Sequence, residues 1–177
     1  KTQSKEMKKV ILSIIALVAM TLSVNAQKFA LVDMEYILKN IPAYEMANEQ
    51  LNQVSLRWEK EVEDLAKEAE TLYKKYQGDM VFLTDEQKKK KEQEILAKEK
   101  EASDLKYKYF GPQGELFKKR ESLIQPIQDD VYNAIKKVSE ERGYQAIFDR
   151  ASSQSIIFAS PRIDVSNLVL EKLGYGK

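Results

Sequence analysis

The chain has 177 residues, of which 29 are basic and 28 are acidic, and it contains neither cysteine nor histidine. The lack of cysteine excludes disulfides and thiolate metal sites, and the balanced charge excludes a general nucleic-acid-binding surface. At this length we expect one domain, or one domain with a long extension.

Residues 1–26 have the pattern of a secretory signal peptide. Two lysines precede an apolar run over residues 10–24, and small residues stand before a predicted cleavage site after Ala26. The alternative is a membrane anchor, but the run is shorter than the roughly 20 apolar residues that cross a bilayer. We therefore expect export and release as a soluble protein. Removal of this segment, with its four lysines and one glutamate, changes the net charge from +1 to −2.

Residues 27–42 are expected to start a small body, with a strand at 29–32 and a brief helix that stops at Pro42. From residue 43 onward, apolar residues recur every three or four positions, with one 4-4 stutter at Trp58, which is typical of a coiled-coil helix. The residues of this seam are Tyr44, Ala47, Leu51, Val54, Trp58, Val62, Leu65, Ala69, Leu72 and Tyr76. Gly78 is expected to end the helix, which would be roughly 50 Å long.

A second helix is expected to begin at a capping box formed by Thr84 and Gln87. Its apolar seam resumes at Ile95, so we predict an antiparallel coiled-coil hairpin over residues 43–119, with its tip near 78–84. The segment Gly111–Gly114 and Pro126 are each expected to kink or interrupt the second helix, and Gly143 to end it.

Residues 120–177 are expected to complete the body with the end of the long helix, strands at 144–149 and 155–159, and a helix between Asp164 and Gly174. The predicted fold class is therefore α+β, mainly α. Three short strands would have unprotected edges and little core, so we predict that sister chains complete the sheet. The body positions predicted to serve this association are Phe29, Leu31, Ile147, Ile156 and Phe158.

No pattern in the sequence indicates catalysis. Most acidic residues lie three or four positions from Lys or Arg on a predicted helix, as expected of solvated ion pairs. We expect no enzyme activity, no cofactor and no metal site. A carboxylate hydrolase would require two acids that converge in a cleft of the body.

The predicted tip is apolar although both flanking segments are highly charged. Its side chains either fold back onto Tyr73 and Tyr76 as a cap or stay accessible to a partner, since exposed apolar groups rimmed by charge mark binding surfaces. The predicted contact residues are Met80, Val81, Phe82, Leu83 and Tyr76. The lysines that follow, Lys88, Lys89, Lys90 and Lys91, form either a solvated face or a contact for anionic lipid.

Three segments resemble the Skp/OmpH family of periplasmic chaperones. They are KFALVDMEYILKNIPAYEMANEQL at 28–51, FGPQGELFKKRESLIQPIQDDVYNAI at 110–135 and GYQAIFDRASSQSIIFASPRIDVSNLVLEKLG at 143–174. The resemblance implies a homotrimer, with strands from three chains in one small barrel and three hairpins around a cavity. It also implies an ATP-independent holdase that binds unfolded outer-membrane β-barrel proteins in the periplasm, with weak contact to lipopolysaccharide or the membrane surface. The alternative is a coiled-coil tether that links folded partners in the cell envelope.

Overall fold

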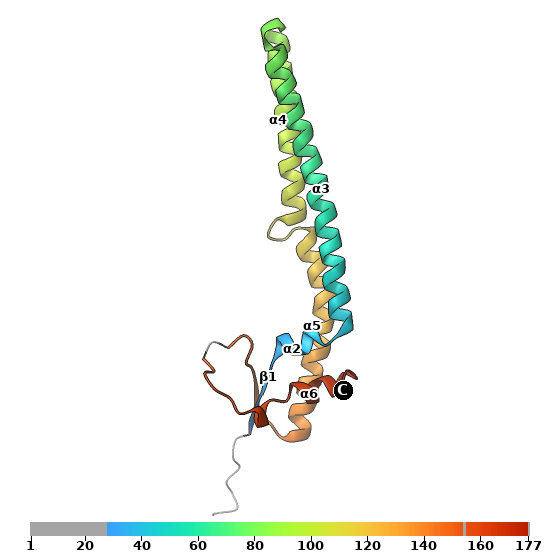
Figure 1. The fold of residues 1–177 in the computed structure, drawn as a ribbon, viewed down its shortest axis with the longest axis vertical. Helices are drawn as coiled ribbons and strands as arrows, with labels where there is room; N and C mark the ends of the chain where they lie inside the picture. The colour runs from blue at the N-terminus through green and yellow to red at the C-terminus, as the bar shows by residue number, and fades with distance from the viewer. Residues whose placement is uncertain (1–27, 154, 177) are drawn as a thin grey trace, which may run out of the picture.

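The computed structural model describes residues 28–153 and 155–176, so the predicted signal peptide lies outside the described residues. A long helical hairpin stands on a small body built from both ends of the described chain (Figure 1). In order, the elements are β1 (Phe29–Val32), α2 (Met34–Lys39), α3 (Pro42–Asp79), a 3-10 helix (Met80–Phe82), α4 (Asp85–Phe110), α5 (Glu115–Arg142), β2 (Ala146–Asp149), a second 3-10 helix (Pro161–Ile163) and α6 (Ser166–Lys172). The predicted fold class, α+β and mainly α, is confirmed.

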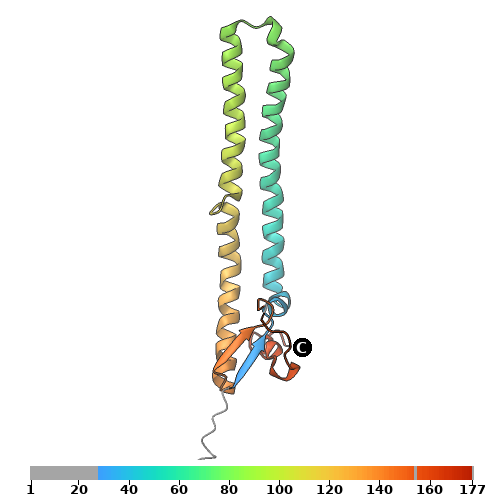
Figure 2. The ribbon, with the colours of Figure 1, turned by 90° about the vertical axis from the view of Figure 1, so that its left-hand side faces the viewer.

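The arms of the hairpin are α3 on one side and α4 followed by α5 on the other (Figure 2). The predicted capping box starts α4, because the Thr84 hydroxyl accepts a bond from the Gln87 backbone N–H at 3.3 Å and the Gln87 side chain accepts one from the Thr84 backbone N–H at 2.9 Å. The prediction that Gly78 ends the first helix is wrong. Gly78 lies inside α3 without a positive φ, and the chain turns instead through the 3-10 helix at 80–82.

The second arm is interrupted once, at residues 111–114, as predicted. Pro126 does not interrupt α5, which runs continuously past it. Because Pro126 is exposed, water can bond the carbonyl group of Ser122, which loses its helical partner to the proline ring. Gly143 ends α5 in the left-handed conformation, with φ of 70°.

The break in the second arm depends on the lack of a side chain at Gly114. A Cβ there would lie 2.7 Å from the carbonyl oxygen of Tyr109 and 2.8 Å from that of Lys108. We therefore expect Gly114→Ala to lower the free energy of unfolding by about 1–3 kcal/mol, measured by urea denaturation. Gly78→Ala is the matched control, since a Cβ at Gly78 meets nothing within 4 Å and a helical alanine is expected to stabilise by about 0.5–1 kcal/mol. Equal effects of the two variants would contradict the close approach at Gly114.

The body is held together by an apolar core between the sheet and the lower end of α5. Strands β1 and β2 pair in parallel, with Phe29 opposite Ala146 and Val32 opposite Asp149. Side chains from the sheet, α2, α5 and α6 form one buried cluster: Ala30, Val32, Ile37, Ile41, Val131, Ala134, Val138, Val165, Val169 and Leu170. Since these residues come from both ends of the described chain, the base of the hairpin is rigidly joined to the sheet.

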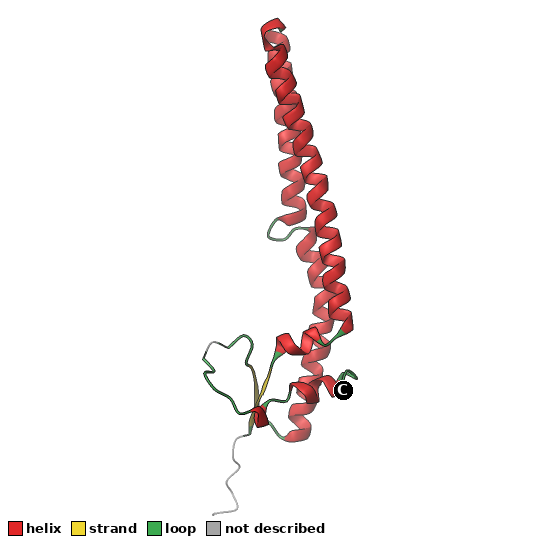
Figure 3. Ribbon diagram, viewed as in Figure 1, coloured by secondary structure: helices red, strands yellow, loops and turns green. Residues whose placement is uncertain are grey.

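The strand predicted at residues 155–159 does not form, and this prediction is wrong for the single chain. Those residues lie in a loop that stands away from the body (Figure 3). Ile157 is 99% and Phe158 85% exposed, so neither side chain packs on an apolar surface of the described residues. The second neighbour of β1 is instead Asp164, through an isolated bridge to Leu31.

Candidate functional site

The tip of the hairpin exposes apolar side chains to solvent. Val81 is 79% and Phe82 85% exposed, Met80 is also exposed, and Leu83 is half-buried. Tyr73, onto which a cap would fold, is itself exposed. Of the two predicted arrangements, the structure therefore shows the tip accessible to solvent and not folded back as a cap.

Tyr76 differs from the other residues predicted to contact a partner. It is buried between the arms, and its hydroxyl donates a hydrogen bond of 2.5 Å to Glu92 of α4. This bond, together with desolvation, raises the pKa of Tyr76. The burial is evidence against the predicted contact role, because Tyr76 already serves to join the two arms.

The four lysines after the tip are partly engaged in local ion pairs. Lys91 Nζ lies 2.8 Å from a Glu94 oxygen, and Lys88 Nζ lies 3.7 Å from an Asp85 oxygen. Such exposed pairs contribute less than about 1 kcal/mol each and leave the chains free to rearrange. Contact of these lysines with anionic lipid stays a prediction.

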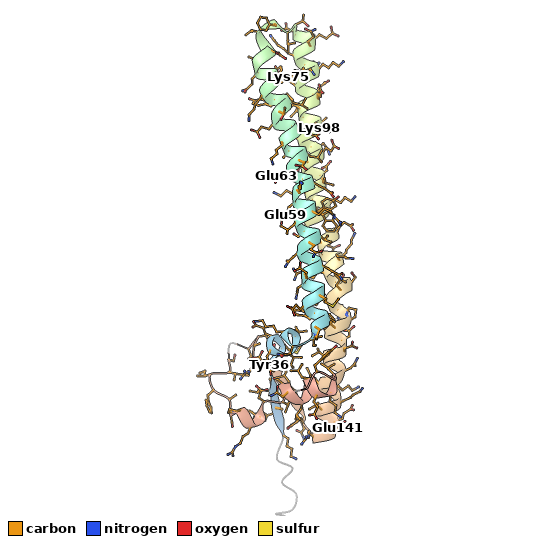
Figure 4. All side chains as sticks on the ribbon, turned by 45° about the vertical axis from the view of Figure 1, so that its right-hand side comes forward. Tyr36, Glu59, Glu63, Lys75, Lys98 and Glu141 are labelled. Atoms are coloured by element: carbon orange, nitrogen blue, oxygen red, sulfur yellow. The ribbon has the colours of Figure 1, made fainter. Side chains whose placement is uncertain are left out.

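Polar contacts join the two arms along one flank. Lys98 of α4, which is labelled in Figure 4, reaches across to Glu68 of α3 at 3.3 Å and along its own helix to Glu101 at 3.0 Å. Hydrogen bonds to Glu101 and then Glu68 raise the pKa of Lys98. On the same flank, the Tyr109 hydroxyl donates to Glu61 at 2.6 Å. These contacts fix the register of the arms. Beside Glu101, a groove of about 490 Å³ is lined by Leu65, Ala97 and Leu105 together with Lys100, Asp104 and Lys108.

The other flank carries a shallow groove of about 300 Å³. Val62 and Ala66 of α3 and Phe110 of α4 line it, together with Glu59, Glu63 and Lys106. Tyr73 lies seven residues after Ala66, and Leu96 lies fourteen before Phe110, so heptad spacing places both on this flank, closer to the tip. Both are exposed, and a discontinuous apolar strip therefore runs from the groove toward the tip.

The body exposes a second apolar surface. Of the residues predicted to associate, Phe29 and Phe158 are exposed, Ile156 is half-buried, and Leu31 and Ile147 pack within the chain. Two further exposed side chains, Phe148 and Ile157, are not among the predicted residues. Phe148 could be predicted from the alternation of side chains along β2. Ile147 faces the core, so the next side chain, Phe148, must point to the opposite face. On the sheet and its following loop, the exposed apolar side chains are thus Phe29, Phe148, Ile157 and Phe158.

This architecture is shared with known proteins. A family model described as outer membrane protein (OmpH-like) matches residues 28–173, which include the hairpin and nearly all of the body. The chain belongs to the OmpH-like family. A crystal structure of a proposed outer membrane chaperone (OmpH-like) from Caulobacter crescentus has the same fold, with a TM-score of 0.65, 11% identity and 82% of each chain covered. No curated protein matches the chain significantly. The resemblance inferred from the sequence is confirmed.

An aromatic stack fills the OmpH-like hairpin at the point where its second arm is broken. The rings of Trp58 and Tyr109 lie 4.6 Å apart and 6° from parallel, and Phe110 meets Tyr109 edge-on at 6.3 Å. Trp58 is the position of the stutter in the first arm, so the change of phase in α3 coincides with the break between α4 and α5. Large rings bridge a place where regular knobs-into-holes packing is interrupted.

Two clefts of the body offer little for acid-base chemistry. One of about 500 Å³ beside α2 and α6 has Glu171 as the only acid among its lining residues. Another, between α5 and α6, has Glu141 and Glu171, and Glu141 is ion-paired to Lys172 at 2.7 Å. Neither supplies the unpaired carboxylates that a hydrolase would require. Among the helices of residues 28–153 and 155–176, none is both long and apolar enough to cross a membrane.

Proposed function

We propose that this OmpH-like protein is an ATP-independent holdase chaperone, which binds unfolded outer-membrane β-barrel proteins in the periplasm and prevents their aggregation. The observation that carries the proposal is the exposed apolar turn of Met80, Val81 and Phe82 at the end of a long charged hairpin. Three consecutive exposed apolar side chains rimmed by charge are typical of a binding surface, unlike single exposed apolar residues. The family membership and the predicted signal peptide support the same function and location.

Binding of an unfolded chain by this hairpin would be weak at each contact and tolerant of sequence. Burial of a large apolar side chain contributes about 1.5–3 kcal/mol when it is complete, and less at an open tip. The strip of Tyr73, Leu96 and Phe110 would add contacts along the arm. Exposed ion pairs along the arms, such as Glu63–Lys67 and Glu70–Lys74, would keep the complex soluble.

We further propose that three chains associate through the body, so that three hairpins surround one client. The apolar side chains at Phe29, Phe148, Ile157 and Phe158 supply a surface that a sister chain can cover. The outer edge of β2 has no neighbour among the described residues, and it would receive a strand from the next chain. The loop at 155–159, which forms no strand alone, is the segment that we expect to pair there.

Suppression of aggregation tests the proposal. An outer-membrane β-barrel protein unfolded in urea is diluted into buffer with increasing amounts of the mature protein, and light scattering is followed. We expect scattering to disappear near one trimer per client without ATP. A coiled-coil tether, which binds folded partners, would leave the scattering unchanged at every ratio, and that result would overturn the holdase.

A further inference from the structure

The exposed loop between β2 and α6 is attached to β1 at both of its ends. The backbone N–H of Arg150, at its start, donates to the carbonyl oxygen of Val32 at 2.8 Å. The backbone N–H of Val165, just past its end, donates to the carbonyl oxygen of Leu31 at 2.8 Å. Two neighbouring carbonyl groups of one strand therefore hold the base of the loop.

The side chain of Arg150 closes the same base with charge. Its Nε and Nη2 atoms donate to Asp33 Oδ2 at 3.2 and 3.1 Å, and its Nη1 lies 3.5 Å from Asp164 Oδ2. Asp33 caps α2 by accepting from the Tyr36 backbone N–H at 2.8 Å. One guanidinium thus joins the start of the loop, the end of the loop and the first helix of the body.

The carboxylates that pair with Arg150 are less exposed to solvent than those of the ion pairs along the arms. The carboxylates of Asp33 and Asp164 are 21% and 22% exposed, whereas arm pairs such as Glu63–Lys67 are more than half exposed on both sides. A planar guanidinium bonded to two partly buried carboxylates restricts geometry more than a flexible surface pair does. Without Arg150, two acidic groups would face one another with no cation between them.

We infer that Arg150 is a positioning residue for subunit association, since it fixes the base of the loop that presents Ile157 and Phe158 to the neighbouring chain. The inference rests on the proposed trimer. Both side chains are exposed, and among the residues that the structure describes no packing orients them. A loop fixed at its base loses less conformational freedom when the sister chain covers it, and association is correspondingly stronger.

The test compares assembly of the mature protein with that of its Arg150→Gln variant by sedimentation at a series of concentrations. We expect the concentration at which half of the chains are assembled to rise about tenfold in the variant, while the helical circular dichroism signal is unchanged. Adding Asp164→Asn to Arg150→Gln should recover part of the loss, because it removes one of the facing charges and keeps a side-chain oxygen for the bond that Ser166 N–H donates at 2.9 Å. Lys172→Gln, which removes the α6–α5 ion pair to Glu141, is the control and should assemble normally.

Equal assembly of Arg150→Gln and the wild type would overturn the inference and leave the proposed trimer intact. Loss of the helical signal in Arg150→Gln would also overturn it, since Arg150 would then be needed for folding rather than for presentation of the loop. A wild type that stays monomeric at every concentration would overturn the proposed trimer itself.

Discussion

Replacement of Met80, Val81 and Phe82 by serine is expected to weaken the binding of an unfolded β-barrel client by about tenfold, since each exposed side chain loses a part of its burial energy. The melting temperature should change little, because none of the three is buried in the hairpin. Assembly should also be unchanged, since the 38-residue α3 separates the tip from the body by roughly 55 Å. Fluorescence titration of a labelled client measures the affinity.

A matched variant tests whether the effect is specific to the tip or arises from the loss of any exposed apolar side chains. Met46, Leu56 and Tyr107 lie on the arms and are exposed to 64%, 66% and 72%, so their replacement by serine removes a comparable exposed apolar surface. We expect that triple variant to bind the client nearly as well as the wild type. Equal losses in the two triple variants would show that the tip has no special role, and no loss in the tip variant would show that the tip does not contact clients.

The double substitution Ile157→Ser and Phe158→Ser is expected to raise the concentration needed for assembly by about a hundredfold. Each side chain is almost fully exposed in the single chain, and its burial by a sister chain would contribute about 1.5–3 kcal/mol. Folding of the subunit should be unaffected, because neither residue belongs to the core cluster. Native mass spectrometry and circular dichroism measure the two properties on the same sample.

The tip triple variant is the natural control for this experiment. It should remain assembled while losing client affinity, whereas the loop variant should lose assembly first and client binding as a consequence. A loop variant that is assembled like the wild type would exclude Ile157 and Phe158 from the subunit interface. A loop variant that is unfolded would show that the loop supports the fold, against its exposure in the single chain.

The hairpin could be predicted from the sequence because its determinants are local. Heptad spacing from Tyr44 to Tyr76, the capping box at Thr84 and the glycines at 111 and 114 each act within a few residues of themselves. The length and direction of the arms follow from these signals. The prediction for Gly78 is wrong because a glycine can end a helix but need not do so, and here the 3-10 helix at 80–82 turns the chain.

The body was harder to predict because its pairing depends on distant residues. The run at 155–159 is rich in strand-forming side chains, yet a strand requires a neighbour, and the described chain provides Asp164 beside β1 instead. The role of Tyr76 is hard to predict for the same reason. An aromatic near the tip could serve as packing or as contact, and only the position of Glu92 on the opposite arm decides that it packs. Arg150 has no local signal, since one carboxylate partner, Asp33, is 117 residues away in sequence and the other, Asp164, lies across a loop.

The native mass of the mature protein, recorded alone and with an unfolded outer-membrane β-barrel protein, tests the central claim most directly. We expect a trimer in the absence of the client and a trimer carrying one client in its presence. A single subunit that acquires no client at any concentration would contradict both the completion of the body by sister chains and the grip of the hairpins on an unfolded partner.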